Sequence, residues 1–433
     1  MIKSRLYYCL GMAATYVAAF AYVAAVPFLA AIMIAWSYFI LINSKSLLPV
    51  IALIIYARSM VGFIADGNTT IYTAMNIAVN YTPTLIYFIL NMKSRRSDFL
   101  IKNYKISILY ACVLIFYSAV SGYDFIYVLG DRILPFFMIL LLVGREDPGT
   151  FNNNFAYVMR FTVLSAIFAE ITPEYTSIGH ELLRNGTIFG SESITSLYLG
   201  VIPRATGPVW DPRILGILCF LNIYIHFSSK KEPISFDIII SIIGVAASLS
   251  RGSIMATGVL IAFFLVSRRS TYGIMTLLML CLTSLFAFKF MVKYIFDRIF
   301  IVGGANPISQ RFDFFMYAID QFMKNPLGIG VGKLRAVSDI VIVSNSSYDT
   351  VTDAYLAIIL AELGVFGFII FILSFKEIFW GDNKLSFAVF LAFVFQMIGT
   401  DIPDFGPYYL VIALVGAAGA KTTKLSLKNY RHA

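Results

Sequence analysis

The sequence contains few of the residues that a water-soluble enzyme displays or uses. Only 13% of its 433 residues are charged, and it has three histidines. In a typical soluble domain about 25% of the residues are charged. So few charges could not cover a surface that faces water, which excludes an ordinary soluble globular protein. A metal centre built from histidine side chains is not expected either, and we predict neither a bound metal nor another cofactor.

Cysteine is also scarce, and its distribution excludes a disulfide framework. Each of the four cysteines lies in an apolar run, and none has the spacing of a metal-ligand motif. The four are Cys9, Cys112, Cys219 and Cys281.

Apolar residues are abundant instead. They make up 59% of the chain, and the mean hydropathy is +0.81. They occur in runs of about 17 to 20 residues, the length that an α-helix needs to cross a bilayer. We therefore predict an all-α polytopic membrane protein, with residues 1–433 forming one integral membrane domain of about fourteen transmembrane helices. The predicted helices are 6–23, 26–43, 47–65, 71–91, 106–121, 125–144, 155–172, 209–228, 236–250, 253–267, 272–291, 355–374, 385–400 and 406–420.

Lysine and arginine residues indicate the orientation of these helices. They occupy every second connection, for example 93–105 and 268–269, and the C-terminal tail, whereas the short connections in between contain few. Because cytoplasmic loops carry an excess of Lys and Arg, both termini are predicted to be cytoplasmic. The net charge of +9 is thus spread over membrane anchors, and nucleic acid is not an expected partner.

Two long connections, about 173–208 and 292–354, are predicted on the opposite side. The second contains an amphipathic helix that Ser309 can cap and that runs to Lys324. Such a helix lies on the bilayer surface or covers a cavity. Its apolar face consists of Phe312, Phe315, Met316, Ile319, Phe322 and Met323, and its polar face of Gln310, Asp313, Tyr317, Asp320 and Lys324.

A glycine pattern follows this helix, formed by Gly328, Gly330 and Gly332. Alternate glycines occur in loops that bind phosphate, but those loops follow a β-strand, and none is expected here. We therefore interpret the pattern as a flexible turn, with phosphate binding as the weaker alternative.

Several charged residues, inside an apolar run or at the outer side of the membrane, are candidates for a functional site. Arg58 lies inside an apolar run, where a charge is expensive and suggests a function. A salt bridge, a helix cap or contact with a lipid headgroup would explain each of the others singly. These others are Arg204, Asp211, Arg213, Arg251, Arg311 and Asp353.

The arginines on the outer side have a chemical property in common. Arginine binds phosphate oxygens through two parallel hydrogen bonds and keeps its charge where the dielectric constant is low. Arg204, Arg213, Arg251 and Arg311 at one face of the membrane therefore predict a site for an anionic, phosphate-bearing substrate that is linked to a lipid.

Four motifs follow one another between about residues 200 and 375. They are Arg204-x-x-Gly207 with Asp211-Pro212 and Gly216; Leu249-Ser250-Arg251-Gly252; Arg311 with a stretch ending in Asn325-Pro326-Leu-Gly328-Ile-Gly330; and Asp353-x-Tyr355-Leu with Glu362-Leu-Gly364-x-x-Gly367. Their order, their spacing and their positions relative to the predicted helices resemble the O-antigen polymerase and O-antigen ligase superfamily of bacterial inner-membrane glycan enzymes. The N-terminal half resembles this superfamily in hydropathy alone.

The resemblance implies a glycosyltransferase of surface polysaccharide or lipopolysaccharide biosynthesis in the bacterial inner membrane. Its donor would be a glycan on undecaprenyl pyrophosphate, bound at the periplasmic face. An acceptor hydroxyl would attack the anomeric carbon and expel the lipid pyrophosphate. By resemblance, Arg204, Arg251 and Arg311 would bind this pyrophosphate or stabilise it as it leaves, with no metal required.

Asp353 stands where the ligase branch typically has a histidine. A carboxylate can act as general base towards a sugar hydroxyl, but Asp353 could equally orient the acceptor or cap the next helix. His180, in the first long outer connection, is an alternative base. Tyr355, together with Arg58, Asp211 and the arginines above, completes the predicted substrate-binding set.

The missing histidine favours a polymerase, whose acceptor is another lipid-linked repeat unit, over a ligase, whose acceptor is lipid A–core. A flippase or other transporter of lipid-linked oligosaccharides is an alternative from a different class of protein. A transporter would carry polar residues along a path through the bilayer, whereas the charges here gather at one face. A partner that regulates chain length would leave no visible mark on this sequence.

Overall fold

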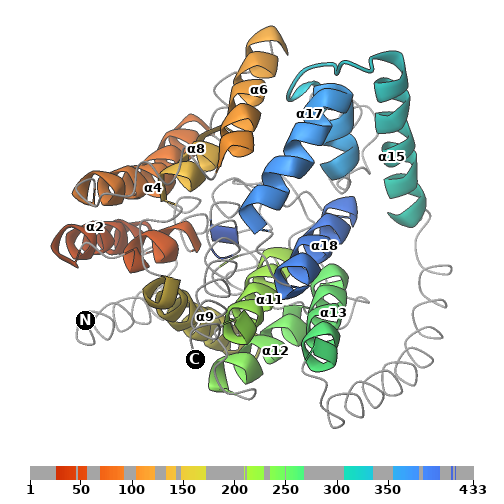
Figure 1. Cartoon of the computed structure of the whole chain (residues 1–433). Coiled ribbons are helices and arrows are strands. Elements are labelled where there is room, and N and C mark those ends of the chain that lie inside the picture. Colours follow the sequence, from red (N-terminus) through yellow and green to blue (C-terminus); the bar gives the residue numbers. More distant parts are fainter. Residues whose placement is uncertain are drawn as a thin grey trace, which may run out of the picture.

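The computed structural model is helical throughout the residues that it describes, with no strand among them (Figure 1). The predicted all-α class is therefore confirmed for this part of the chain, while the number of fourteen transmembrane helices stays a prediction. The structure describes residues 26–44, 47–55, 69–91, 104–121, 133–142, 148–171, 209, 212–228, 235–248, 250–267, 307–334, 355–379, 384–399, 411–412 and 415.

The helices agree closely with the apolar runs from which they were predicted, because each run provides one stretch of side chains that can be buried or face lipid. The largest difference is α9, which begins at residue 148 rather than at 155. The predicted helices 6–23 and 272–291 lie outside the described residues. The helices are α2 (Val26–Ser44), α4 (Thr69–Leu90), α6 (Lys105–Ser121), α8 (Leu134–Leu142), α9 (Pro148–Ile171), α11 (Pro212–Ser228), α12 (Phe236–Ser248), α13 (Arg251–Ser267), α15 (Pro307–Lys324), α17 (Tyr355–Phe379) and α18 (Lys384–Gly399).

The character of the helices fits a membrane protein. Among the described residues, α17 alone is long and apolar enough to cross a bilayer when its 25 residues are counted together, although it is broken at Gly364, and several shorter helices are strongly apolar. Large apolar side chains such as Phe39, Phe116 and Met255 are exposed. Contiguous exposed apolar surface is rare on soluble proteins, so lipid is the solvent that these helices suit.

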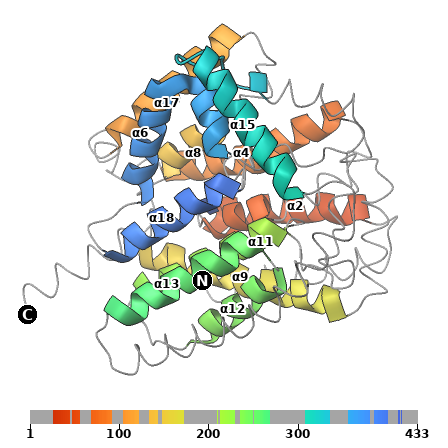
Figure 2. The same ribbon diagram turned by 90° about the vertical axis from the view of Figure 1, so that its right-hand side faces the viewer.

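Helix α11 lies at the centre of the described structure. Each of its residues from 214 to 228 is buried, which is the pattern of a helix surrounded by other helices. It packs against α9, α12 and α13, and α13 in turn packs against α18. In Figure 2, α13 and α18 run across the view, whereas α15 and α17 stand steeply. Helix α17 packs against α6, α15 and α18, so α18 connects the two groups.

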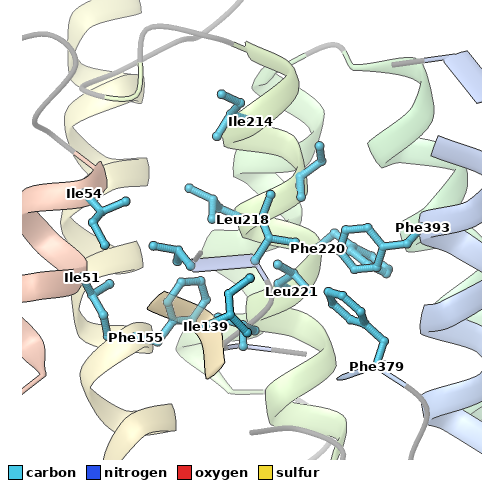
Figure 3. Close-up of a cluster of buried hydrophobic side chains, with 14 of the residues drawn as sticks. Ile51, Ile54, Ile139, Phe155, Ile214, Leu218, Phe220, Leu221, Phe379 and Phe393 are labelled. Atoms are coloured by element: carbon cyan, nitrogen blue, oxygen red, sulfur yellow. The ribbon is translucent and has the colours of Figure 1, made fainter. Parts of the chain in front are cut away.

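The main hydrophobic cluster joins these groups from within (Figure 3). Aromatic rings of α11, α17 and α18 meet there: Phe393 lies 5.9 Å from Phe220 and 4.9 Å from Phe379 between ring centroids. Ile51, Ile139 and Phe155 approach the same centre from other helices. Fully buried rings each remove a large apolar area from the solvent, so this cluster holds α11 in place.

Helix α17 is broken at Gly364, where φ is 65° and ψ is −173°. The centroids of the rings of Tyr355 and Phe371 are 5.8 Å apart, although 16 residues of straight helix would separate them by about 24 Å. The two arms of α17, before and after Gly364, therefore fold back beside each other (Figure 1). The prediction of one continuous helix over 355–374 was wrong in this respect.

Candidate functional site

The turn between α12 and α13 is built from three buried serines. The hydroxyl of Ser248 donates to the carbonyl oxygen of Val245 at 2.8 Å, and the N–H of Ser250 donates to the Ser248 hydroxyl at 3.3 Å. The hydroxyl of Ser253 then donates to that of Ser250 at 3.1 Å. Serine hydroxyls that bond to nearby backbone groups favour a turn over a continuous helix, so α12 ends here and α13 begins at Arg251.

Gly216 brings the first turn of α11 against this serine turn. A Cβ atom on Gly216 would lie 2.6 Å from Oγ of Ser253 and 2.8 Å from Oγ of Ser248, closer than side chains approach. Glycine is therefore what allows the two segments to touch. Arg213 lies about one helical turn before Gly216, and Arg251 lies two residues before Ser253. We call this meeting of the starts of α11 and α13 the arginine corner.

The arginine corner collects positive charge from two sources. The start of each helix carries unpaired N–H groups and an effective charge of about +0.5. Pro212 at the start of α11 has no N–H and a φ angle that suits this position. Arg213, which is half-buried, and the backbone of Arg251 lie at the same corner. Helix starts attract anions such as phosphate. Anion binding by Arg213 and Arg251 stays a prediction, because the Arg251 side chain lies outside the described part of the structure.

The structure brings together only some of the residues predicted for the site. Arg213 and Arg251 meet at the arginine corner through their helices. Arg311 lies on α15, which packs against the α17 arm that begins at Tyr355. The side chains of Arg251 and Arg311 lie outside the described part of the structure. The remaining predicted residues, Arg58, His180, Arg204, Asp211 and Asp353, lie outside the described residues altogether.

The segment 325–334, which we call the glycine loop, pairs with the break in α17. Gly328, Gly330 and Gly332 have φ angles of 97°, 103° and 84°, a region that favours glycine. The N–H of Ile329 donates to the carbonyl of Ala361 at 3.0 Å. In addition, the Gly330 N–H donates to the carbonyl of Glu362 at 2.9 Å, and the Val365 N–H to that of Pro326 at 3.1 Å. The loop thus occupies backbone groups that the break releases from the helix.

Side chains from two helices also hold the glycine loop. The carboxylate of Glu362, which is fully buried, accepts a hydrogen bond from the N–H of Gly332 at 2.9 Å. The hydroxyl of Tyr117 on α6 donates to the carbonyl oxygen of Leu327 at 2.6 Å. The interpretation of this segment as a flexible turn was therefore wrong, because its backbone is bonded to fixed partners. Three N–H groups that a phosphate-binding loop would offer to a ligand are already used by α17.

Helix α15 confirms the predicted amphipathic helix, with a different start. It begins at Pro307, so Ser309 lies inside the helix and does not cap it. Ala318 and Phe322 pack towards the first arm of α17, against Ala357 and Ala361. Met316 and Met323 from the predicted apolar face are exposed instead. The predicted apolar face of α15 is therefore only partly covered by α17, and the part that includes Met316 and Met323 is exposed.

Tyr355, the first residue of α17, is 2% exposed, and its ring packs edge-on against that of Phe371. Phe371 also lies 5.4 Å from the ring of Tyr110 on α6. Aromatic pairs at these distances stabilise a core. The ring of Tyr355 therefore helps to hold the two arms of α17 together, and its contact with substrate stays a prediction.

An ionic cluster, in which Asp237 and His226 are buried and Arg160 is partly exposed, was missed in the sequence. The guanidinium of Arg160 on α9 donates from Nη2 to Oδ2 of Asp237 at 2.8 Å and from Nε to Oδ1. Nε2 of His226 lies 3.3 Å from Oδ2 of the same carboxylate. The cluster ties together α9, α11 and α12. Arg160 and Asp237 both fall inside predicted spans, so the principle that singled out Arg58 could have found them.

A second carboxylate on α17, that of Glu377, caps α6 at its N-terminus. Oε2 of Glu377 accepts hydrogen bonds from the N–H of Ser107 at 2.8 Å and from its hydroxyl at 2.6 Å. The hydroxyl of Ser374 reaches that of Ser107 at 3.2 Å. Burial of Tyr104 close to this cap raises the pKa of its phenol. A negative charge at a helix start is stabilising, so Glu377 fixes where α6 begins against α17.

Together these features define a helical protein of the membrane type, with arginines at the starts of helices and a broken helix closed by a glycine loop. Residues 237–372 match the O-antigen ligase family. The match confirms the resemblance to the O-antigen polymerase and ligase superfamily over this segment, and the members of the matched family are glycosyltransferase-like enzymes. No curated protein matches the chain.

The matched segment includes much of the site described above. It contains Arg251, the helix that carries Arg311, the glycine loop, the first arm of α17 and the beginning of its second arm. Arg204, Asp211 and Arg213 precede it. The arginine corner therefore joins one helix inside the matched segment to one outside it.

Proposed function

We propose that the protein is an O-antigen polymerase, or a polymerase of a related surface polysaccharide. It transfers a glycan chain from undecaprenyl pyrophosphate to the sugar of another lipid-linked repeat unit, at the periplasmic face of the inner membrane. The observation that carries this proposal is the arginine corner, which gathers two helix starts and two arginines beside the serine turn.

The proposed chemistry uses the corner as an anion site. The acceptor hydroxyl attacks the anomeric carbon of the donor, and the bond from that carbon to the pyrophosphate oxygen breaks. Negative charge develops on the departing lipid pyrophosphate, and fixed positive groups aimed at it lower the barrier. Arg204, Arg213, Arg251 and Arg311 supply this charge without a metal. Asp353, as the proposed base, takes the proton that the acceptor hydroxyl loses.

A ligase that transfers the glycan to lipid A–core is the second candidate. The family that residues 237–372 match is described as O-antigen ligase but covers polymerases as well, so the match supports both candidates equally. Asp353-Ala354 in place of a histidine-containing pair favours the polymerase. Both candidates share the donor and the leaving group, so the arginine corner serves either one.

The decisive experiment offers purified protein the acceptors of both reactions. The protein is incubated in detergent with synthetic lipid-linked repeat units, without nucleotide and with a chelator present. A ladder of longer glycans supports the polymerase. Transfer to added lipid A–core without a ladder selects the ligase. If neither product forms and lipid-linked sugar crosses a proteoliposome bilayer, both enzyme proposals are wrong and the transporter is favoured.

A further inference from the structure

We propose that Glu362 is a positioning residue for glycan transfer. Its buried carboxylate fastens the glycine loop to the break in α17, and the loop in turn sets α15, which carries Arg311, against the α17 arm that starts at Tyr355. This inference rests on the proposed function, because it assigns Arg311 to the pyrophosphate site.

The first step of the argument is the burial of Glu362. Its side chain is 0% exposed, and a carboxylate removed from water is costly unless it accepts hydrogen bonds. The N–H of Gly332 provides one at 2.9 Å. The carbonyl of the same residue accepts from Gly330 at 2.9 Å, so Glu362 holds two points of the loop through two different groups.

The second step concerns the space around these bonds. A Cβ atom on Gly328 would lie 2.5 Å from the carbonyl oxygen of Glu362, and one on Gly364 would lie 2.3 Å from the carbonyl carbon of Leu327. The loop therefore lies directly against the backbone of α17. Contacts this close fix the loop in one register, which a side chain on either glycine would destroy.

The third step connects the loop to α15. Ile329 and Leu334 of the loop pack in one cluster with Ala318 and Phe322 of α15 and with the first arm of α17. Arg311 lies seven residues before Ala318, about 10 Å along the helix. When Glu362 releases Gly332, the end of the loop next to Leu334 loses the side-chain bond that holds it, and Leu334 is one of the residues that contact this helix.

The fourth step concerns the N–H groups of the loop, which bond to α17 and are therefore not free to bind a phosphate. Successive N–H groups in loops with positive φ form a concave site that attracts anions. In this protein a carboxylate already bonds to Gly332, and α17 carbonyls bond to Ile329 and Gly330. These N–H groups are therefore already used within the protein, so substrate pyrophosphate is left to the arginines.

The test compares three substitutions of Glu362 in full-length protein in detergent. Glu362→Gln keeps an oxygen that accepts from Gly332 and should retain activity within about threefold. Glu362→Ala removes this acceptor oxygen. Glu362→Asp shortens the side chain by one methylene, so that the carboxylate no longer reaches the N–H of Gly332. For these two we expect kcat to fall about 100-fold, because the pyrophosphate site is misplaced, while KM for the lipid-linked donor stays within about threefold.

Glu377→Ala is the matched control, since it removes a carboxylate from the same helix. It should lower the melting temperature through loss of the α6 cap and leave kcat unchanged. If Glu362→Ala also lowers only the melting temperature, with kcat unchanged, the residue is structural and the inference is wrong.

Hydrogen exchange measured by mass spectrometry separates this inference from the proposed function. Amides of residues 329–332 should be protected in the unaltered protein and in Glu362→Gln, and should exchange faster in Glu362→Ala and Glu362→Asp. Unchanged exchange in these two variants overturns the docking role, whatever the activity. If the exchange behaves as expected but the unaltered protein transfers no glycan to either acceptor, the proposed function fails and with it the assignment of a positioning role.

Discussion

Around α11, uninterrupted helices meet mainly through side chains, whereas the glycine loop that follows α15 meets α17 at a break through backbone groups. In the first region α11 is buried on all sides. Its Gly216 touches the serine turn, and its His226 lies beside Asp237 of α12. Its Phe220 meets Phe393 of α18 edge-on. In the second region the bonds run from loop N–H groups to carbonyls of α17, next to glycines with positive φ. Both regions contain arginines that were predicted to bind pyrophosphate.

The difference between these regions determines what each one tolerates. Side-chain contacts can relax when one residue changes, and a substitution in a well-packed core usually lowers the free energy of unfolding by about 1 to 3 kcal/mol. A backbone contact at a glycine with positive φ has no side chain that could move away. We therefore expect the α15–α17 region to be the less tolerant of the two, and the four predictions below test that expectation.

Gly364→Ala should have the largest effect. Its φ of 65° is costly for any residue with a side chain, and the new Cβ would lie 2.5 Å from the carbonyl oxygen of Pro326. We expect a loss of at least about 3 kcal/mol in unfolding free energy, seen as low membrane abundance and a lower melting temperature in detergent. Gly258→Ala on α13 is the control, because nothing lies within 4 Å of its added Cβ. Equal behaviour of the two variants would remove the contrast between the regions.

Arg251→Ala and Arg204→Ala should change activity and leave stability intact. Loss of a fixed cation at the departing pyrophosphate should lower chain extension about 100-fold in the purified assay, at normal membrane abundance. Lysine in either place should rescue only part of the activity, because it keeps the charge but loses the planar fork. Wild-type chain length in both alanine variants would contradict the assigned role.

Arg160→Met should lower stability and leave the activity of each folded molecule unchanged. Asp237 would stay buried without its guanidinium partner, and we expect a loss of about 2 kcal/mol. This is less than for a fully buried pair, since the Arg160 side chain is 42% exposed. A double-mutant cycle with Asp237→Asn should show that the two losses are not additive. Additive losses measured by thermal unfolding would mean that the pair contributes nothing as a pair.

Tyr117→Phe should have the smallest effect. It removes one hydroxyl that bonds to Leu327, which is worth about 1 kcal/mol, and should speed hydrogen exchange in the glycine loop. Tyr38→Phe is its counterpart between α2 and α4, where the hydroxyl bonds to the carbonyl of Ala78 at 3.0 Å. That variant should lose a similar amount of stability without changing exchange in the loop. Faster loop exchange in both variants would show that the effect is not local.

Hydropathy was enough to place most of the described helices, because apolar runs of sufficient length leave the backbone few alternatives. The runs 26–43, 71–91 and 385–400 each correspond to a helix within two residues at either end. The amphipathic pattern of α15 was equally informative about its existence. Its start was misplaced because proline suits the first position of a helix. The helix therefore begins at Pro307, and Ser309, the predicted cap, lies inside it.

The break in α17 could not be predicted from its own residues. Gly364 stands in an apolar run, and a glycine in a helix costs only about 1 kcal/mol. The glycine loop forces the bend, and it lies about 30 residues earlier in the sequence. The ionic cluster escaped notice for a similar reason. The partners Arg160 and Asp237 are on different helices, and no local pattern joins them.

The glycine loop leaves the ribosome before the helix that it bends. While α17 is being made, its 25 residues are apolar enough to form one straight helix, and Gly364 permits either shape. Only contact with a segment that is already in place supplies the donors for Ala361 and Glu362. The bend thus depends on a contact between two segments that are distant in sequence. A chain without the glycine loop would leave α17 without the donors that its break requires.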